Sequence, residues 1–346
     1  MAFRRSSILL AVLGIVLIAL AATVRPLIVP WATRLPDDID VTLKYVGTAT
    51  LLDSKALAAG DVEHALVSDV PATVDRRVHV VTTKGDKALI ADDTTVRVGE
   101  TKMPSSFKYA VDRDNLQATD APANWKGVQP AKGLTVAFPI APKADDRYTY
   151  FDPMTQSTTR VDFKGKDHMR GRDVYNYRMT VTGALKDRTT LATLPPALPK
   201  ALAVSLLPQL PPASAAEIRR NAATLPDPIP LAYTVSTTAD LAVDQDTGIV
   251  IDAQLRQQVT ANTAAGSAQT PLLPVFALNV AATPASHKDL VDRASSTGTM
   301  LLVLKTVTPL ALLGVGLLLL TIAVIRRRRP TAPDTAAKQA AEAAAG

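Results

Sequence analysis

The residues best suited to proton transfer or metal binding are four histidines that stand far apart in the chain. They are His64, His79, His168 and His287. None belongs to a His-Glu-x-x-His motif or to a pair at metal-ligand spacing. The chain has no cysteine, which excludes disulfides, thiolate metal sites and cysteine nucleophiles. We therefore interpret the histidines as ordinary surface or core residues.

Two pairs of adjacent aspartates are the next candidates for acid–base chemistry. They are Asp92-Asp93 and Asp145-Asp146. Neighbouring side chains in a strand point to opposite faces, so neither pair forms an obvious acid–base couple, and we interpret all four as solvated loop acids. The chain also lacks a Gly-x-Ser-x-Gly elbow and a phosphate-binding P-loop. We therefore expect no catalytic activity, no cofactor and no metal.

Two turns place an aspartate three residues before a threonine, at 152–156 and 244–248. The second has some of the composition of a calcium loop, but its glycine is displaced and Leu255 stands where an EF-hand needs a bidentate acid. We predict hairpin turns instead, in which the aspartate accepts hydrogen bonds from nearby backbone and Gly248 supplies a positive φ. The similarity of the two turns hints at two related hairpin units.

The strongest pattern in the chain is a stretch of twenty residues without charge at 306–325. Four arginines come directly after it: Arg326, Arg327, Arg328 and Arg329. As a helix this stretch spans roughly 30 Å, the thickness of a bilayer's hydrocarbon core. The arginines predict that its C-terminal end is cytoplasmic, with a basic, alanine-rich tail at 326–346. Gly314 and Gly316 lie inside this helix, where small residues favour helix contact rather than phosphate binding.

A second apolar stretch, 8–24, comes after Arg4 and Arg5 near the N-terminus. A cleaved signal peptide is one interpretation, favoured by small residues at 19 and 21. The length of the stretch and the apolar segment up to Trp31 favour a retained signal anchor at 8–25, after a cytoplasmic segment at 1–7. Both alternatives export the region between the two apolar stretches. With two anchors, both termini are cytoplasmic and that region lies outside the plasma membrane.

Most of the net charge of +6 lies beside these two membrane segments, and the middle of the chain is close to neutral. Orientation of the helices therefore explains the charge, and a nucleic-acid partner is not expected, because nucleic acid requires a basic stripe.

The region 36–285 predicts an antiparallel β domain. Apolar and polar residues alternate there, as at Val41, Leu43 and Tyr45, which is the period of a half-buried strand. Many short strands separated by turns indicate a mainly β (α+β) outer domain, flanked by one transmembrane helix at each end. The polar composition of residues 286–305 predicts a stalk, with Lys305 at the outer membrane boundary. These patterns leave open whether the strands form one subdomain or two.

An apolar, proline-rich insert at 191–230 interrupts the strand pattern. Short helices are expected at 200–207 and 214–223, because prolines prevent longer ones. Packing on the strand domain is one interpretation; lining an apolar ligand groove or touching the membrane surface are the others. The leucines proposed to contact an apolar ligand are Leu194, Leu198, Leu202, Leu206, Leu207 and Leu210.

Four features recur together in one known family. They are the Arg4-Arg5 signal anchor, the Tyr150-Phe151-Asp152-Pro153 turn leading to Val161-Asp162-Phe163-Lys164-Gly165 and Gly171-Arg172-Asp173-Val174-Tyr175-Asn176-Tyr177, the Val243-Asp244-Gln245-Asp246-Thr247-Gly248 hairpin, and the final helix with its arginine run. Over about residues 3 to 329 the chain resembles the actinobacterial PorA-family porins, also described as a domain of unknown function (DUF3068). The resemblance implies a cell-envelope protein with a β-rich outer domain and provides no catalytic residues. Members of that family have been linked to channel formation and to maturation of cell-wall lipoglycans.

These observations support three functions. The first is a non-enzymatic envelope protein whose outer domain binds or scaffolds a lipid or lipoglycan, alone, as a homo-oligomer or with other envelope proteins. The second is a channel-forming oligomer. A transmembrane barrel is disfavoured, because it needs strands of about ten residues with an outward apolar band and aromatic girdles, whereas aromatics are 4% of this chain and we expect short strands. An enzyme whose site forms only on folding is third.

Overall fold

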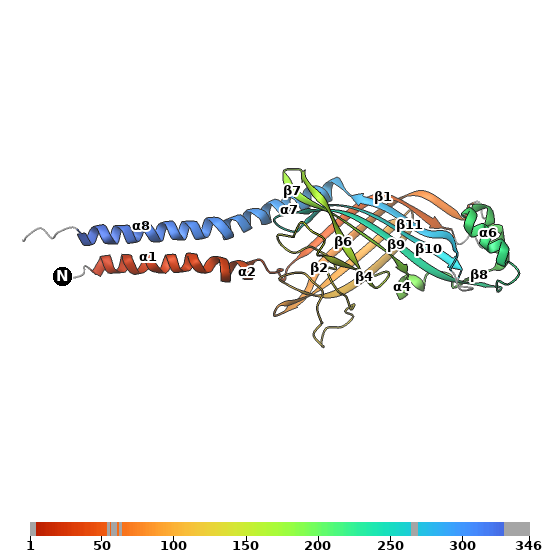
Figure 1. Ribbon diagram of the computed structural model, residues 1–346, viewed down its shortest axis with the longest axis horizontal. Helices are drawn as coiled ribbons and strands as arrows, with labels where there is room; N and C mark the ends of the chain where they lie inside the picture. The colour runs from red at the N-terminus through yellow and green to blue at the C-terminus, as the bar shows by residue number, and fades with distance from the viewer. Residues whose placement is uncertain (1–4, 54–55, 57–60, 62–63, 264–268, 329–346) are drawn as a thin grey trace, which may run out of the picture. The chain divides into compact units, whose positions relative to one another are not determined.

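The computed structural model describes residues 5–53, 56, 61, 64–263 and 269–328. The chain divides into two compact units (Figure 1). The helix unit comprises Met1–Thr33 and Thr299–Gly346, and the β unit comprises Arg34–Gly298. Arg4, Arg329 and the rest of the expected tail lie outside the described residues.

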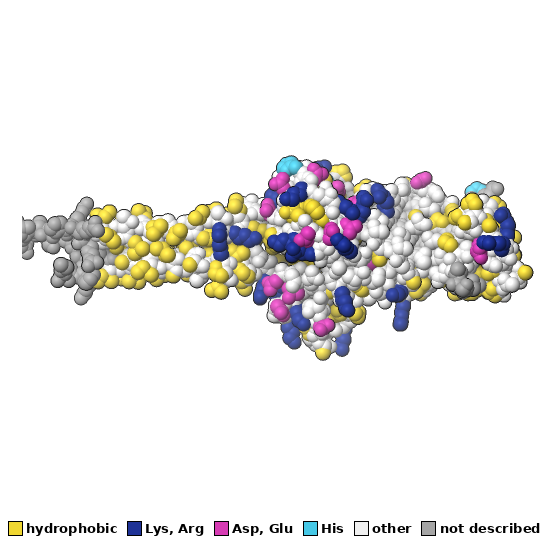
Figure 2. Space-filling view, viewed as in Figure 1, with side chains coloured by type: hydrophobic (Ala, Val, Ile, Leu, Met, Phe, Trp, Pro, Cys, Tyr) yellow, Lys and Arg dark blue, Asp and Glu magenta, His cyan; other side chains and the backbone are white. Residues whose placement is uncertain are grey.

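The helix unit contains two long apolar helical runs. Its elements are α1 (Arg5–Thr23), the π-helical turn η1 (Val24–Ile28), α2 (Val29–Ala32), the end of α7 (Pro284–Leu302), the π-helical turn η3 (Val303–Val307) and α8 (Thr308–Arg328). The runs Ile8–Ala32 and Pro284–Arg326 are long and apolar enough to cross a membrane. Large apolar side chains such as Leu9 and Leu310 are exposed along them. Hydrophobic side chains cover much of this part of the molecule (Figure 2), as expected for surfaces that contact lipid.

Two glycines allow α1 and α8 to approach closely. A Cβ added to Gly14 would lie 2.8 Å from the Gly316 carbonyl oxygen, and one added to Gly316 would lie 2.8 Å from Ile18 Cγ1. A Cβ on Gly314 would meet nothing within 4 Å. Of the two glycines in α8, only Gly316 therefore lies at the helix contact, where a small residue lets the backbones approach.

The β unit is built on one antiparallel sheet, which confirms a mainly β domain. Its strands are β1 (Asp40–Leu52), β2 (Leu66–Lys84), β3 (Lys87–Val98), β4 (Thr101–Asp112), β5 (Thr149–Asp152), β6 (Ser157–Met169), β7 (Arg172–Ala184), β8 (Ala197–Leu198), β9 (Ile229–Asp244), β10 (Val250–Thr263) and β11 (Pro271–Ala282). The order is β4-β3-β2-β1-β11-β10-β9-β7-β6-β5, and β8 pairs with β9. The first strand, β1, pairs with the last strand, β11, in the middle of the sheet.

The sheet curls, and the chain between β4 and β5 joins its two edges. Ala118 bridges to Val111 of β4, and Leu134 bridges both to Gln117 and to Tyr150 of β5. These contacts cover edges that would otherwise expose unpaired backbone groups.

The expectation of short strands was wrong. Among the described residues, nine strands have 12 to 19 residues. Threonine, serine and charged residues within them obscured the alternation, although strands tolerate them on an exposed face. The exposed large apolar side chains among the described β-unit residues are only Val46, Val67, Val81 and Val204. The strands are thus long enough to span a bilayer but lack an outward apolar band.

The segment expected to be a stalk begins as helix α7, which packs on the sheet up to Gly298. Leu290 is 7% exposed and Ala294 is fully buried, and both pack against Val174 and Ile251. They stand four residues apart and therefore share one helix face. The polar residues on the other faces of α7 gave this segment its hydrophilic composition.

We expect Gly316→Val to separate α1 from α8, because the added side chain meets Ile18 and the Gly14 backbone. The cysteine-free chain allows spin labels at Leu9→Cys and Val324→Cys, whose separation is measured by pulsed electron paramagnetic resonance in micelles. The distance distribution should broaden and lengthen as the axes move toward the about 8–10 Å separation of ordinary helix pairs. Gly314→Val is the matched control and should leave it unchanged; equal effects of both variants would refute the glycine contact.

Candidate functional site

Most of the proposed ligand-contact leucines help to build the core. The insert forms α4 (Arg188–Leu191), β8, α5 (Lys200–Ser205), the 3-10 turn η2 (Leu207–Gln209) and α6 (Pro212–Asn221), including the two short helices expected from the sequence. Leu198, Leu206 and Leu210 are 4%, 2% and 6% exposed. They join one core cluster, against which Leu202 and Leu207 pack while partly buried.

Leu194 differs from the other five because it lines a pocket. The cavity measures about 310 Å³. Its lining is Ala184, Leu185, Leu191, Leu194, Pro196, Leu231, Ala232, Tyr233 and Gln269. The walls come from the end of β7, the insert and the start of β9, so the pocket lies where the insert covers the end of the sheet.

Hydrogen bonds fix the walls of this pocket. The Tyr233 hydroxyl donates to the Pro195 carbonyl at 2.6 Å, and burial raises the pKa of Tyr233 to about 12. The Leu185 amide donates to the Tyr233 carbonyl at 2.8 Å. Asp187 caps α4 by accepting from the Thr190 amide at 2.8 Å. The pocket is thus a partly open hollow with a mostly apolar lining, to which Tyr233 and Gln269 add polar groups.

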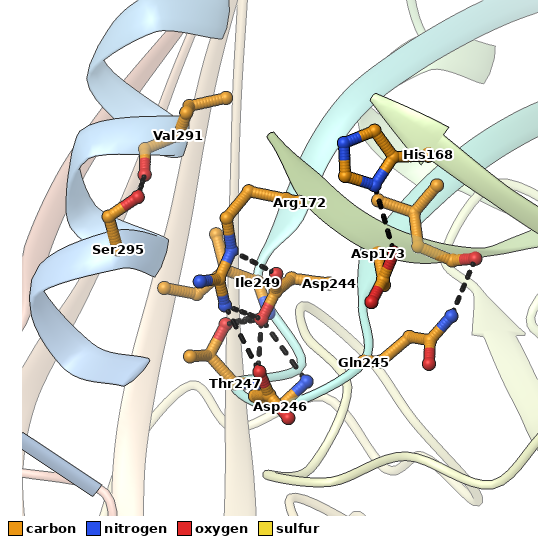
Figure 3. Close-up of polar contacts among 11 residues, drawn as sticks. His168, Arg172, Asp173, Asp244, Gln245, Asp246, Thr247, Ile249, Val291 and Ser295 are labelled. Atoms are coloured by element: carbon orange, nitrogen blue, oxygen red, sulfur yellow. Dashed lines mark hydrogen bonds and ion pairs between the residues drawn. The ribbon is translucent and has the colours of Figure 1, made fainter. Parts of the chain in front are cut away.

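A second cluster joins two of the motifs that carry the family resemblance. Arg172 donates from Nε to Asp244 Oδ2 at 2.7 Å and from Nη2 to Asp244 Oδ1 at 2.9 Å. Asp244 also accepts from the amide and hydroxyl of Thr247 at 2.9 and 2.7 Å. Figure 3 shows Arg172 between this turn and the helix that carries Val291 and Ser295. The sequence presented both motifs, but nothing in it indicated that they pair.

Burial and charge make this pair strong. The side chain of Asp244 is 1% exposed and that of Arg172 is 18% exposed. Burial raises the pKa of Asp244, but hydrogen bonds from Arg172 and Thr247 and the charge of Arg172 outweigh it, so the pKa lies below its ordinary value. A Cβ on Gly298 of α7 would lie 3.1 Å from Arg172 Nη2. The pair therefore connects the β9–β10 turn to the place where α7 packs.

Both predicted hairpin turns are present. In the first, Asp152 Oδ2 accepts from the amide and hydroxyl of Thr155 at 2.8 and 2.6 Å, as Asp244 does with Thr247. Gly248 has a φ of 73°, as a left-handed turn position requires. Within the described ranges no group of three or more His, Asp or Glu side chains is arranged to hold a metal ion.

The interpretation of Asp92 as a solvated loop acid was wrong. Asp92 and Asp93 lie in β3 on opposite faces, and Asp92 accepts from Arg76 Nε at 2.9 Å and Nη2 at 2.6 Å. The Asp92 side chain is only 13% exposed. Tyr150 lies beside this pair, and burial raises its pKa to about 12. Asp93 instead accepts from the Ser106 hydroxyl at 2.6 Å.

The other acids and three of the four histidines have separate charged partners nearby. Asp145 pairs with Arg147 at 2.7 Å and Asp146 pairs with Arg160, both in exposed positions. His168 Nδ1 lies 2.9 Å from Asp173 at the β6–β7 turn. His64 lies 2.9 Å from Asp61, and His79 lies 3.6 Å from Asp93. The His287 backbone amide donates to the Thr283 carbonyl at 2.9 Å, and its buried ring Nε2 has no hydrogen-bond partner among the described residues.

Comparisons with known proteins identify a family. The family model described as Porin PorA matches residues 6–325, and no curated protein matches the chain. Similar solved structures include a conserved protein of unknown function with a hot dog fold from Alicyclobacillus acidocaldarius, 11% identical, with 72% of this chain and 81% of that chain covered and a TM-score of 0.12. A MaoC-like dehydratase is 10% identical, with 72% and 76% covered and a TM-score of 0.13. TM-scores this low do not establish a shared fold with either protein. The family match and the two apolar helices together indicate a porin-like membrane protein.

We expect Asp244→Asn to destabilise the β unit by about 3 kcal/mol at neutral pH, because it leaves Arg172 without its buried counter-charge. Urea unfolding of the full chain in micelles, followed by circular dichroism, measures this. The folded-state pKa of Asp244 lies below its ordinary 3.8, so its stabilisation is present above about pH 4 and lost as pH falls further. In Asp244→Asn, the free energy of unfolding should no longer include this loss of stability below about pH 4.

The matched control is Asp246→Asn, since Asp246 lies 3.4 Å from the same arginine but is 74% exposed. Its effect should stay within about 0.5 kcal/mol. Equal losses in both variants would contradict a special role for the Asp244 pair.

Proposed function

The chain belongs to the porin PorA family, and on that premise we propose that its β unit binds the apolar part of an envelope lipid or lipoglycan. The two apolar helices anchor the β unit to the plasma membrane. The arginines at Arg326–329 and near the N-terminus favour cytoplasmic termini and an outward-facing β unit. The binding is non-catalytic.

The observation that carries this proposal is the pocket beside Leu194. A volume of about 310 Å³ lies at the lower end of the range for ligand sites, roughly 300–1,000 Å³. It therefore suits a segment of an acyl or prenyl chain rather than a whole lipid. Each buried methylene contributes about 0.8 kcal/mol, so a few methylenes give useful affinity after the cost of immobilising the chain.

A channel is the second candidate because the family is described as porins. The strands argue against a channel formed by the sheet. Pairs such as Arg178 with Asp240 and Thr182 with Ser236 lie on exposed strand faces, where a membrane barrel needs apolar residues. A channel would have to form from the helices of several copies, whose apolar stretches provide no polar lining.

We expect Leu194→Trp to displace about two methylenes of a bound chain and to weaken binding roughly tenfold. The measurement is native mass spectrometry of the full chain purified from its native host, with extraction and identification of retained lipid. Val204→Trp is the matched control, because Val204 lies in the same insert but is 45% exposed and does not line the pocket. Lipid that survives Leu194→Trp undiminished, or is lost equally in both variants, would overturn the pocket as the binding site.

We expect the purified full chain to produce no discrete conductance steps in planar lipid bilayers, because its strand faces are polar and its helical spans are apolar. Protein-free bilayers and a detergent-only addition are the controls. Reproducible unitary steps that scale with added protein would favour the channel and count against lipid binding as the main activity.

A further inference from the structure

Both helical runs of the helix unit widen into a π-helical turn at the same level. These turns are η1 (Val24–Ile28) and η3 (Val303–Val307). Arg25 Nε donates to the Lys305 carbonyl oxygen at 3.1 Å, so the two turns face each other. Single π-helical turns are rare and are frequent at functional sites.

Each turn carries a cation, and together the two cations mark one boundary of the apolar span. Arg25 lies twenty residues after Arg5, and Lys305 precedes Arg326 by twenty-one. At about 1.5 Å per residue, both intervals correspond to roughly 30 Å, the thickness of the hydrocarbon core. Arg25 and Lys305 thus lie at the depth of lipid phosphates when the pair of helices spans a bilayer.

No acidic residue lies nearby in the sequence to balance these charges. The chain has no Asp or Glu from Met1 to Pro36 or from Arg293 to Pro333. Among the described residues, no ion pair involves either Arg25 or Lys305. Cations without an acidic partner at a low-dielectric boundary lose hydration, so an anion that binds beside them is stabilising.

The hydrogen-bond inventory indicates which anion fits. Arg25 uses Nε for the Lys305 carbonyl, which fixes the guanidinium and leaves the N–H groups of Nη1 and Nη2. Lys305 adds an ammonium group, which binds phosphate as a point charge. The oxygens of a phosphate group can accept from the two guanidinium nitrogens of Arg25 and also balance the charge of the Lys305 ammonium.

We propose that Arg25 and Lys305 form a binding site for the phosphate of an anionic phospholipid in the surrounding bilayer. A lipid whose phosphate carries no covalently attached cation, such as phosphatidylglycerol, is preferred over phosphatidylcholine, because its charge is not offset by its own head group. This site is separate from the apolar pocket of the β unit and does not depend on the proposed function.

Trp31 provides the readout, because it is 73% exposed and six helical residues, about 9 Å, from Arg25. Trp125→Phe removes the other tryptophan. The full chain is reconstituted in phosphatidylcholine vesicles containing equal fractions of either dibrominated phosphatidylglycerol or dibrominated phosphatidylcholine. The ratio of Trp31 quenching by the two lipids should favour phosphatidylglycerol in the parent chain.

Arg25→Gln with Lys305→Gln should lower this preference by about fivefold for each cation removed, the effect of roughly 1 kcal/mol per basic residue. Arg25→Lys should retain an intermediate preference, because it keeps the charge without the fork. The matched control is Arg5→Gln with Arg326→Gln, which removes one cation from each helix at the opposite boundary and should leave the ratio unchanged. An unchanged ratio in the first variant, or an equal fall in the control, would overturn the site.

Discussion

The two free edges of one long antiparallel sheet are the constraint on which the β unit depends. An unpaired edge offers backbone donors and acceptors to other chains, so a stable sheet of this length must cover it. The chain between β4 and β5 does so through the bridges of Ala118 and Leu134. Leu134 is 1% exposed, so packing as well as hydrogen bonding holds this closure. Without disulfides, the unit relies on such contacts for its rigidity.

Closure also explains where the charged pairs lie. Because β5 comes to lie near β2 and β3, Tyr150 reaches the Arg76–Asp92 pair. At the turn between β9 and β10, Arg172 and Asp244 occupy a similar buried position beside α7. Buried ion pairs contribute little net stability but strongly disfavour arrangements that separate them. Arg76–Asp92 therefore favours the pairing of the neighbouring strands β2 and β3, and Arg172–Asp244 favours one arrangement of segments 72 residues apart.

Local patterns were sufficient for the membrane helices, the hairpin turns and the short helices of the insert. A charge-free run or an Asp-x-x-Thr turn is stabilised by nearby residues, so it can be predicted without the fold. Pairing between distant residues could not be predicted in this way. Arg172 and Asp244 are 72 residues apart, and Asp92 appeared to be a loop acid because the polar residues around it hid its strand.

The insert shows why apolar composition alone did not identify a binding site. Leu198, Leu206 and Leu210 are apolar because they cover the end of the sheet, which needs the same residues as a ligand groove. Prolines break the cover into short rigid pieces, such as α6 beginning at Pro212, and rigid pieces cannot fill every gap. The pocket beside Leu194 is where that cover is incomplete. Its lining is mostly apolar, with Tyr233 and Gln269 as polar members, so composition alone does not separate a binding site from an imperfectly covered core.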